Sequence, residues 1–414
     1  MSVIEYRRLK NGLRIVAEEI PYVRSVSLGV WINVGSRMED KSNYGIAHFI
    51  EHMLFKGTKN RTSRQISNDI DYYGGNINAF TTEDHTCYHV KMPSNHIDIG
   101  IDVLADMINN SEFDEENIEK EKTVIIEEIK MYQDSSEDYL YDELLMRTFD
   151  NKGVGRNVLG TKESVSEISR DKIVDFFEKY YVPNNAVIVL SGNFVLDDIL
   201  KKIEDGFKTW EKKDLIPKRE GQEFKAVRFI EDKDDEQVNL AMIFECPDDS
   251  IDKEFYAVKL LGNILGNTPS SRLFQHIREE KGLSYSIYSS DSFYVGYGEF
   301  GIFSSMASEN LREVYDSIIY EIENLKNNYI TEEELVFAKE QYKGMVIMNL
   351  EDTEDRMMLI GEYEVENRRL RNIEEVIQCV DSIDLDYMKT MIDRIFSKEM
   401  SVGITGKSVK TIMK

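Results

Sequence analysis

Two stretches of this chain, far apart in the sequence, follow the same order of features. The apolar segment Val26–Ile32 (VSLGVWI) is matched by Val238–Phe244 (VNLAMIF). Each is followed by a candidate helix and then by a Ser-Arg pair that precedes a glycine by ten residues. The pairs with their glycines are Ser63-Arg64 with Gly74, and Ser271-Arg272 with Gly282. Because internal repetition reflects a repeated structural unit, we expect two copies of one fold of roughly 200 residues each.

The boundary between the copies is predicted from a break in the apolar pattern. Apolar periodicity lapses in Lys212–Gly221 (KKDLIPKREG), as it does in linkers between domains. We therefore predict one domain at residues 1–213, a linker at 214–221, and a second domain at 222–414.

Helices and strands are intermingled in both halves without a steady β-α-β alternation, which favours the α+β class. A hairpin is expected at Asn11-Gly12. The predicted strands are Leu13–Ala17, Ser25–Val34, Asn76–Thr82, Thr86–Met92, Ala186–Leu190 and Val238–Phe244. The predicted helices are Ser63–Tyr73, Ile97–Asn109, Glu115–Tyr132 and Phe255–Leu265, together with the histidine-bearing segment described next.

That segment, Gly45–Thr58 (GIAHFIEHMLFKGT), contains the pattern H-x-x-E-H. Its apolar residues and lack of proline predict a helix, with Ser42 or Asn43 available to cap it. On a helix His48 and His52 lie on one face, one turn apart, so both imidazoles can reach one metal ion. Glu51 lies at the edge of that face, where a carboxylate can act on water without binding the metal. The alternative is a partly buried helix with two satisfied histidines.

A catalytic zinc site also needs a third protein ligand. The best candidates lie in Ile118–Tyr132, where positions 118, 121, 125, 128 and 132 share one helical face. Two of these positions are carboxylates, Glu121 and Glu128. Acidic groups on a core-facing stripe need a partner, which a metal ion or an imidazole N–H would supply. The alternative is that both reach water at the edge of the stripe.

Other histidines are weaker candidates. His85 and His89 are also four residues apart, but they lie in a predicted strand, where that spacing is about 13 Å and excludes chelation of one ion. In the second half, Lys259, Gly262 and Asn263 stand where His48, Glu51 and His52 stand in the first. The second half is therefore not expected to bind a metal in the same way.

Composition and charge exclude several classes of protein. With 77 acidic and 51 basic residues, the net charge of −26 disfavours nucleic-acid binding. No apolar run is long enough for a membrane helix, and the N-terminus lacks the apolar core of a secretory signal. Three cysteines, scattered singly, suit a reducing cytoplasm.

Three motifs together resemble the insulinase/pitrilysin family of zinc peptidases. They are HFIEHMLFKGT, NAFTTEDHTCY and EKEKTVIIEEIKMYQD, and later segments such as SSRLFQHIREEKGLSYSIYS agree. The size resembles the short-subunit branch, which includes the mitochondrial processing peptidase β subunit and bacterial processing-protease-like proteins. The resemblance covers nearly the whole chain and implies two similar α+β domains, each a mainly antiparallel sheet packed against helices.

The resemblance also implies a role for each matching residue. His48, His52 and Glu128 would bind one Zn²⁺ per chain, Glu51 would be the general base, and Glu121 would orient the site. A substrate backbone would pair with an edge strand, and two residues of the second half would contact the substrate and stabilise the oxyanion. The strand residues are Asn78, Ala79 and Phe80, and the second-half residues are Arg278 and Tyr285.

These roles predict a zinc metalloendopeptidase that cleaves extended or unfolded peptides. By analogy with short-subunit relatives, we expect a homodimer enclosing a peptide-sized chamber, in which Arg278 and Tyr285 act on the site of the other chain. The competing hypothesis is a catalytically idle subunit that holds peptides or serves as a structural core. Hydrolysis of a non-peptide ester or amide is disfavoured, because a β-edge substrate site suits a peptide.

Overall fold

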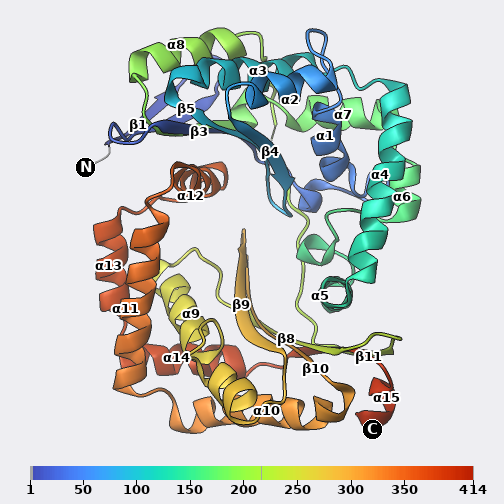
Figure 1. Cartoon of the computed structure of the whole chain (residues 1–414), viewed down its shortest axis with the longest axis vertical. Coiled ribbons are helices and arrows are strands. Elements are labelled where there is room, and N and C mark those ends of the chain that lie inside the picture. Colours follow the sequence, from blue (N-terminus) through green and yellow to red (C-terminus); the bar gives the residue numbers. More distant parts are fainter. Residues whose placement is uncertain (1–2, 216, 414) are drawn as a thin grey trace. The chain divides into compact units, whose positions relative to one another are not determined.

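The computed structural model describes residues 3–215 and 217–413, in which helices and two β-sheets are mixed (Figure 1). The predicted α+β class with two similar domains is confirmed. Position 216 of the predicted linker lies outside the described residues, as do positions 1, 2 and 414. Within the described ranges, none of the helices has both the length and the apolar character needed to cross a bilayer.

The first sheet has six strands in the order β1-β2-β6-β3-β5-β4. Its strands are β1 (Val3–Arg8), β2 (Arg14–Glu19), β3 (Ser25–Ile32), β4 (Asn76–Thr81), β5 (Thr86–Pro93) and β6 (Ala186–Gly192). Neighbouring strands are antiparallel except β2 and β6, which are parallel. The predicted hairpin joins β1 and β2, with Gly12 at φ +93°. Strand β4 forms one edge of the sheet.

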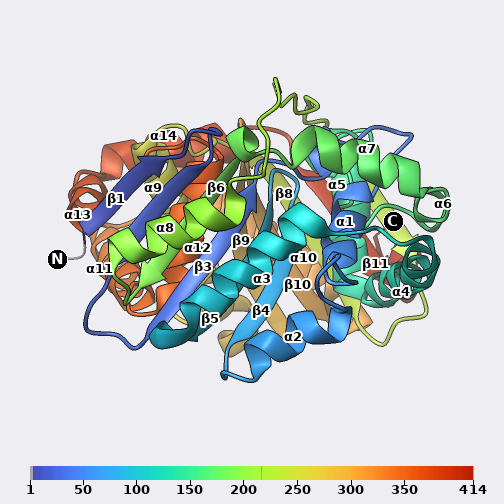
Figure 2. The same ribbon diagram turned by 90° about the horizontal axis from the view of Figure 1, so that it is seen from above.

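The helices of the first half, with one exception given below, are α1 (Ile46–Leu54), α2 (Ser63–Asp71), α3 (Ile97–Asn110), α4 (Glu115–Asp134), α6 (Lys162–Ser166), α7 (Arg170–Tyr180) and α8 (Leu196–Phe207). Among these helices, α3, α1 and α2 contact one face of this sheet, α8 packs on α3, and α7 packs on α1. Short η segments lie at Ser36–Met38, Ser94–His96, Gly153–Gly155 and Pro183–Asn185. Leu28 and Tyr88 of the sheet share a buried core with Phe49 of α1. In Figure 2, α3 and α8 lie side by side across the strands.

The opposite face of the first sheet is covered by α12 (Thr353–Val365), which comes from the second half of the chain (Figure 1). Trp31 and Val187 of the sheet share a second core with Met357 and Ile360 of this helix. Ion pairs surround that core, among them Glu18 with Arg356 and Lys91 with Asp352. The sheet that carries the predicted site is therefore completed by a helix from the other half of the chain.

The second sheet repeats the topology of the first. Its order, β7-β11-β8-β10-β9, matches β2-β6-β3-β5-β4, and the single parallel pair, β7 with β11, has the same place in the order as β2 with β6. The strands are β7 (Arg228–Asp232), β8 (Val238–Cys246), β9 (Ser286–Tyr294), β10 (Tyr297–Met306) and β11 (Ser401–Gly406). The duplication predicted from the sequence thus extends to strand order and direction.

The second sheet, like the first, packs against helices of its own half and against one helix from the other half. The helices of the second half, besides α12, are α9 (Asp252–Leu265), α10 (Leu311–Asn328), α11 (Glu332–Asn349), α13 (Ile373–Asp381), α14 (Leu385–Phe396) and α15 (Val409–Ile412), with η5 (Phe274–Glu280) and η6 (Ser308–Asn310). One face of the second sheet is covered by a helix of the first half, α5 (Ser136–Thr148), whose Leu140 and Leu144 pack on Ala241 and Ile243.

By packing, the chain divides into two compact units that exchange these two segments. One comprises Met1–Ile129, Arg156–Gly221 and Asn349–Leu370, and the other comprises Lys130–Gly155, Gln222–Met348 and Arg371–Lys414. The predicted break near residue 221 coincides with one of these divisions. The boundaries 1–213 and 222–414 stay a prediction about domains, since each unit also contains a helix from the other half.

Candidate metal centre

The histidine helix α1 begins at Gly45, which has a left-handed φ of +86°. A Cβ at this position would lie 2.7 Å from the carbonyl oxygen of Leu159, so both space and backbone favour glycine. The buried carboxylate of Glu39 accepts hydrogen bonds from the backbone N–H groups of Gly45 (2.8 Å) and Ala47 (2.9 Å). These are donors that the start of a helix leaves unpaired.

The expected capping by Ser42 or Asn43 is therefore wrong. Asn43 accepts a hydrogen bond from the backbone N–H of Asp40, and the hydroxyl of Ser42 donates to the Asp40 carboxylate. Both side chains stabilise the preceding turn and do not contact the helix terminus. Glu39 takes their place because the turn brings it back beneath the first residues of α1.

The structure brings His48, His52 and Glu128 together. The Nε2 atom of His48 lies 3.8 Å from Oε2 of Glu128, and Nε2 of His52 lies 3.5 Å from the same oxygen. One potential ligand atom from each of the three side chains lies within 4.8 Å of the other two. Among the described residues this is the one cluster of three or more His, Cys, Asp or Glu side chains with that geometry.

The donor set fits zinc. With Zn–N and Zn–O bonds of about 2.0–2.2 Å, ligand atoms in a tetrahedral site lie roughly 3.3–3.6 Å apart, close to the two distances observed. Burial lowers the pKa of His48 to about 3, with a smaller effect from His52, so its imidazole stays neutral and able to bind a metal. The buried Nδ1 of His48 has no hydrogen-bond partner among the described residues.

Glu121 lies behind the cluster and holds one of its imidazoles. The Nδ1–H of His52 donates to Oε1 of Glu121 at 2.7 Å, which directs Nε2 of His52 toward Glu128. Lys56 forms an ion pair with the other oxygen of Glu121 at 2.6 Å. Burial raises the pKa of Glu121, but the hydrogen bonds from His52 and Lys56 outweigh burial, and the net shift is downward. Glu121 is thus held as a carboxylate.

Glu51 lies beside the cluster and is not one of its three converging groups. Its Oε2 accepts a hydrogen bond from the hydroxyl of Thr81, at 2.6 Å. Burial raises the pKa of Glu51, and the Thr81 hydrogen bond opposes that shift without cancelling it. A carboxyl group with a raised pKa is suited to exchanging protons near neutral pH.

The predicted substrate strand is at the sheet edge, as expected, since β4 pairs with β5 alone. The side chain of Phe80 packs edge-on against Trp31, with ring centroids 5.6 Å apart. The side-chain oxygen of Asn78 accepts a hydrogen bond from the backbone N–H of Ala79 at 2.9 Å. In this conformation the side chain of Asn78 occupies one backbone donor at the edge of β4.

Comparison with known proteins places these residues in a family. A family model described as insulinase (peptidase family M16) matches residues 14–162, and one described as the peptidase M16 inactive domain matches residues 167–342. A protein of Bacillus subtilis named an uncharacterized zinc protease is 36% identical over 399 residues, which cover 96% of this chain and 97% of that protein. This chain belongs to the insulinase family, peptidase family M16.

Other relatives and structures agree with this assignment. An uncharacterized zinc protease of Mycobacterium leprae is 32% identical, with 96% of this chain and 90% of that protein covered. A protease from Helicobacter pylori has the same fold, with a TM-score of 0.91 at 24% identity over 98% of this chain and 99% of that one. A structure titled peptidase M16 inactive domain, from Pseudomonas fluorescens, has a TM-score of 0.90 at 18% identity, covering 98% of each chain.

In the second unit of this insulinase-family chain, the residues that the sequence aligns with the two histidines make other contacts. Lys259, in place of His48, forms an ion pair with the buried Asp291. Asn263, in place of His52, donates a hydrogen bond to the side-chain oxygen of Gln341 at 2.5 Å. These contacts engage both side chains, and the correspondence of Lys259, Gly262 and Asn263 with His48, Glu51 and His52 stays a prediction from the sequence.

Arg278 and Tyr285 both belong to the second unit. Arg278 lies in the segment η5, with its guanidinium 4.8 Å from the ring centroid of Phe274. Tyr285 precedes β9; its backbone N–H donates to Ser305, and its side chain is 74% exposed. The phenol is therefore accessible to a ligand, and the substrate role given to these two residues stays a prediction.

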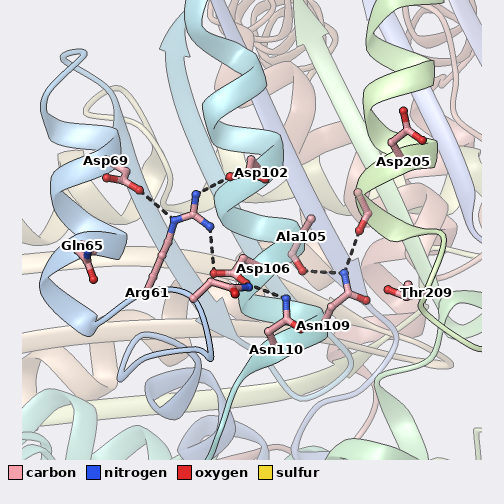
Figure 3. A pocket seen from close by; sticks show the side chains of 12 residues that line it. Arg61, Gln65, Asp69, Asp102, Ala105, Asp106, Asn109, Asn110, Asp205 and Thr209 are labelled. Carbon is pink, nitrogen blue, oxygen red and sulfur yellow. Dashed lines mark hydrogen bonds and ion pairs between the residues drawn. The ribbon is translucent and has the colours of Figure 1, made fainter.

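A separate hollow of about 550 Å³ lies between α2, α3 and α8 of the first unit (Figure 3). Figure 3 shows Arg61 at its centre, where the guanidinium meets the carboxylates of Asp69, Asp102 and Asp106. Asp106 is further satisfied by Thr58 and two asparagines. This network joins α2, α3 and the turn before α2. The carboxylates in it already have partners.

Three residues of the site were missed by sequence reasoning: Glu39, Lys56 and Thr81. Lys56 follows His52 by four residues, in the turn just after α1, and this short separation could have indicated a cation near the site. Thr81 lies within the quoted motif, next to the predicted substrate strand. The role of Glu39 had no local signal, because it depends on how a turn folds back.

Proposed function

We propose that this insulinase-family chain is a zinc-dependent endopeptidase that cleaves extended or unfolded peptides. The observation that carries this proposal is the convergence of His48, His52 and Glu128 beside a separate carboxylate, Glu51. A purely structural zinc site would use four protein ligands and needs no adjacent base, whereas a catalytic site keeps a position open for water or substrate.

When bound by these three side chains, Zn²⁺ supplies a Lewis acid and lowers the pKa of water to about 7. Glu51 accepts a proton from the attacking water while the oxygen of that water adds to the scissile carbonyl carbon. Glu51 then gives a proton to the departing nitrogen as the C–N bond breaks. The water is consumed, and the products are a carboxylate and an amine. The raised pKa of Glu51 supports both proton transfers.

The edge strand β4 supports recognition through the peptide backbone. An added strand would pair with Asn78–Phe80, and its side chains would alternate between the two faces. The N–H of Ala79, now hydrogen-bonded to Asn78, would instead donate to a substrate carbonyl. Because a folded protein seldom offers a free strand of this kind, extended peptides are the substrates this edge favours.

The test is cleavage of a quenched fluorescent peptide library by zinc-loaded protein. Glu51→Gln should retain one zinc per chain and lose activity by at least about 1,000-fold, since the ligands are intact and the base is absent. A matched control is Glu116→Gln, at an exposed position of α4 where the carboxylate forms an ion pair with Lys120, and this variant should cleave normally. An idle peptide-holding subunit would instead bind peptides without cutting them, with or without zinc.

We also propose that the active form is a homodimer in which Arg278 and Tyr285 contact the substrate bound to the other chain. Family resemblance and the exposed side chain of Tyr285 support this. Mixing Glu51→Gln with Tyr285→Phe subunits should recover part of the activity. No recovery, after exchange of subunits has been verified, would place these residues in the site of their own chain.

All three cysteines are free, which supports a reducing cytoplasm as the compartment.

A further inference from the structure

The carboxylate of Glu51 is held by a side chain from a different element of the fold. Thr81, the last residue of β4, donates its hydroxyl proton to Oε2 of Glu51 across 2.6 Å. Among the described residues, this is the one hydrogen bond that the Glu51 carboxylate accepts. The other carboxylate oxygen is therefore left for a reacting water.

A second threonine lies opposite Thr81 across the sheet and does not compete for the Glu51 carboxylate. Thr81 pairs with Thr86 of β5, and the two Oγ1 atoms are 3.4 Å apart. The buried hydroxyl of Thr86 donates its single proton to the carbonyl oxygen of Val34 at 2.9 Å, so it does not also donate to Thr81. Because a carboxylate can only accept, the 2.6 Å contact with Glu51 uses the single hydroxyl proton of Thr81.

We propose that Thr81 is the positioning residue of the general base. A glutamate side chain has several rotatable bonds, and its free carboxylate would sample orientations that do not accept a proton from water. A short, charge-assisted hydrogen bond from a β-strand restricts that sampling. This inference rests on the proposed peptidase function, because it assigns a role to a residue that acts through Glu51.

The position of Thr81 in the sequence gives the contact a further consequence. It directly follows Asn78–Phe80, the segment proposed to pair with the substrate backbone. The strand that aligns the scissile bond therefore also aligns the base. A rigid strand that holds both groups keeps the base and the carbonyl in register, which loops would do less well.

Two substitutions separate the hydroxyl from the shape of the side chain. Thr81→Val keeps the branched shape and removes the donor, whereas Thr81→Ser keeps the donor. Thr81→Val should lower kcat by roughly 10- to 100-fold with KM within about twofold, and Thr81→Ser should restore kcat to within about threefold of the wild type. Thr82→Val is the matched control, since the Thr82 hydroxyl donates to the His85 carbonyl and not to Glu51. It should lower the melting temperature and leave kcat nearly unchanged.

A second readout does not depend on turnover. Zinc affinity, measured by competition with a chromogenic chelator, should be the same in Thr81→Val and wild type, because Thr81 contacts none of the three ligands. Equal kcat for Thr81→Val and wild type would overturn the inference, and so would a loss of zinc that accounts for the lost activity. If wild type does not cleave peptides, or Glu51→Gln cleaves them normally, the proposed function fails instead.

Discussion

His52 donates its Nδ1–H to Oε1 of Glu121 across 2.7 Å, which links the histidine helix α1 to α4. The same helix α4 carries Glu128 two turns further on, so one element supplies both the third potential ligand and the group that orients the second. This arrangement fixes the tautomer of His52 and leaves its Nε2 lone pair facing Glu128. The affinity of the site for zinc should therefore depend on a residue that does not touch the metal.

Replacing Glu121 tests that dependence. Glu121→Gln should weaken zinc binding by roughly 10- to 100-fold, because an amide accepts the His52 hydrogen bond less strongly than a carboxylate does. Chelator competition followed by metal analysis measures the change. Glu116→Gln, exposed on the same helix, is the control and should bind zinc as the wild type does. Unchanged affinity in Glu121→Gln would mean that His52 is oriented by packing alone.

Replacing Lys56 should change the stability of the metal-free protein, which the next experiment measures. The side chain of Glu121 is 4% exposed and carries a negative charge that Lys56 offsets in the metal-free protein. Lys56→Met should destabilise the metal-free protein by roughly 1–3 kcal/mol, because the buried charge loses a partner. Zinc adds positive charge to the cluster and should recover part of that loss. The increase in melting temperature on adding zinc should thus be larger in Lys56→Met than in wild type, as measured by calorimetry. An equal or smaller increase would contradict the role of Lys56 as a counter-charge.

The two histidines should behave differently when zinc displaces protons. Burial lowers the pKa of His52, but Glu121, through its hydrogen bond and its charge, and the nearby Glu128 and Glu51 outweigh burial, and the net shift is upward from 6.5. The pKa of His48 is about 3, chiefly through burial. At pH 6 the imidazole of His52 is therefore mostly in its cationic form, whereas that of His48 is neutral.

Zinc binding at pH 6 should accordingly release about one proton from the imidazoles. Affinity should fall about tenfold for each unit of pH below the pKa of His52, since a protonated imidazole cannot bind a metal. Titration calorimetry in buffers of different ionisation enthalpy counts the released protons. Release of two would show that His48 is also protonated in the free chain, contrary to its burial.

Local patterns predicted the site well where its parts lie on single elements. The spacing of His48 and His52 places them on one helical face, and Glu121 is buried on α4 as expected. The predicted stripe faces the core only in part, because Glu128 is half-buried and Tyr132 is exposed. The edge position of β4 followed from the resemblance. Each of these features depends on the period of a helix or strand, which is written in a few consecutive residues.

The features that were missed depend on contacts between distant elements. Glu39 binds the start of α1 only because of the intervening turn, and Thr81 reaches Glu51 from 30 residues away. The exchange of α5 and α12 was also missed. Both helices have weak amphipathic patterns, so neither sequence indicates which sheet it will cover. Periodicity predicts that a helix forms. The sheet on which the helix packs depends on how well the side chains of the two surfaces fit together.

Gly361 and Trp31 show how closely that shape is specified. A Cβ on Gly361 of α12 would lie 2.1 Å from Cε2 of the buried Trp31 ring, so any side chain would push the helix from the first sheet. Gly361→Ala should lower the free energy of unfolding by about 1–3 kcal/mol, the usual cost of overpacking a core. Gly344→Ala in α11 is a matched control, because its Cβ would meet nothing within 4 Å, and it should stabilise the chain by about 0.5–1 kcal/mol. Urea unfolding of both variants measures the difference. If Gly361→Ala were as stable as Gly344→Ala, α12 would not pack on Trp31, and the exchange of helices between the two halves would be wrong.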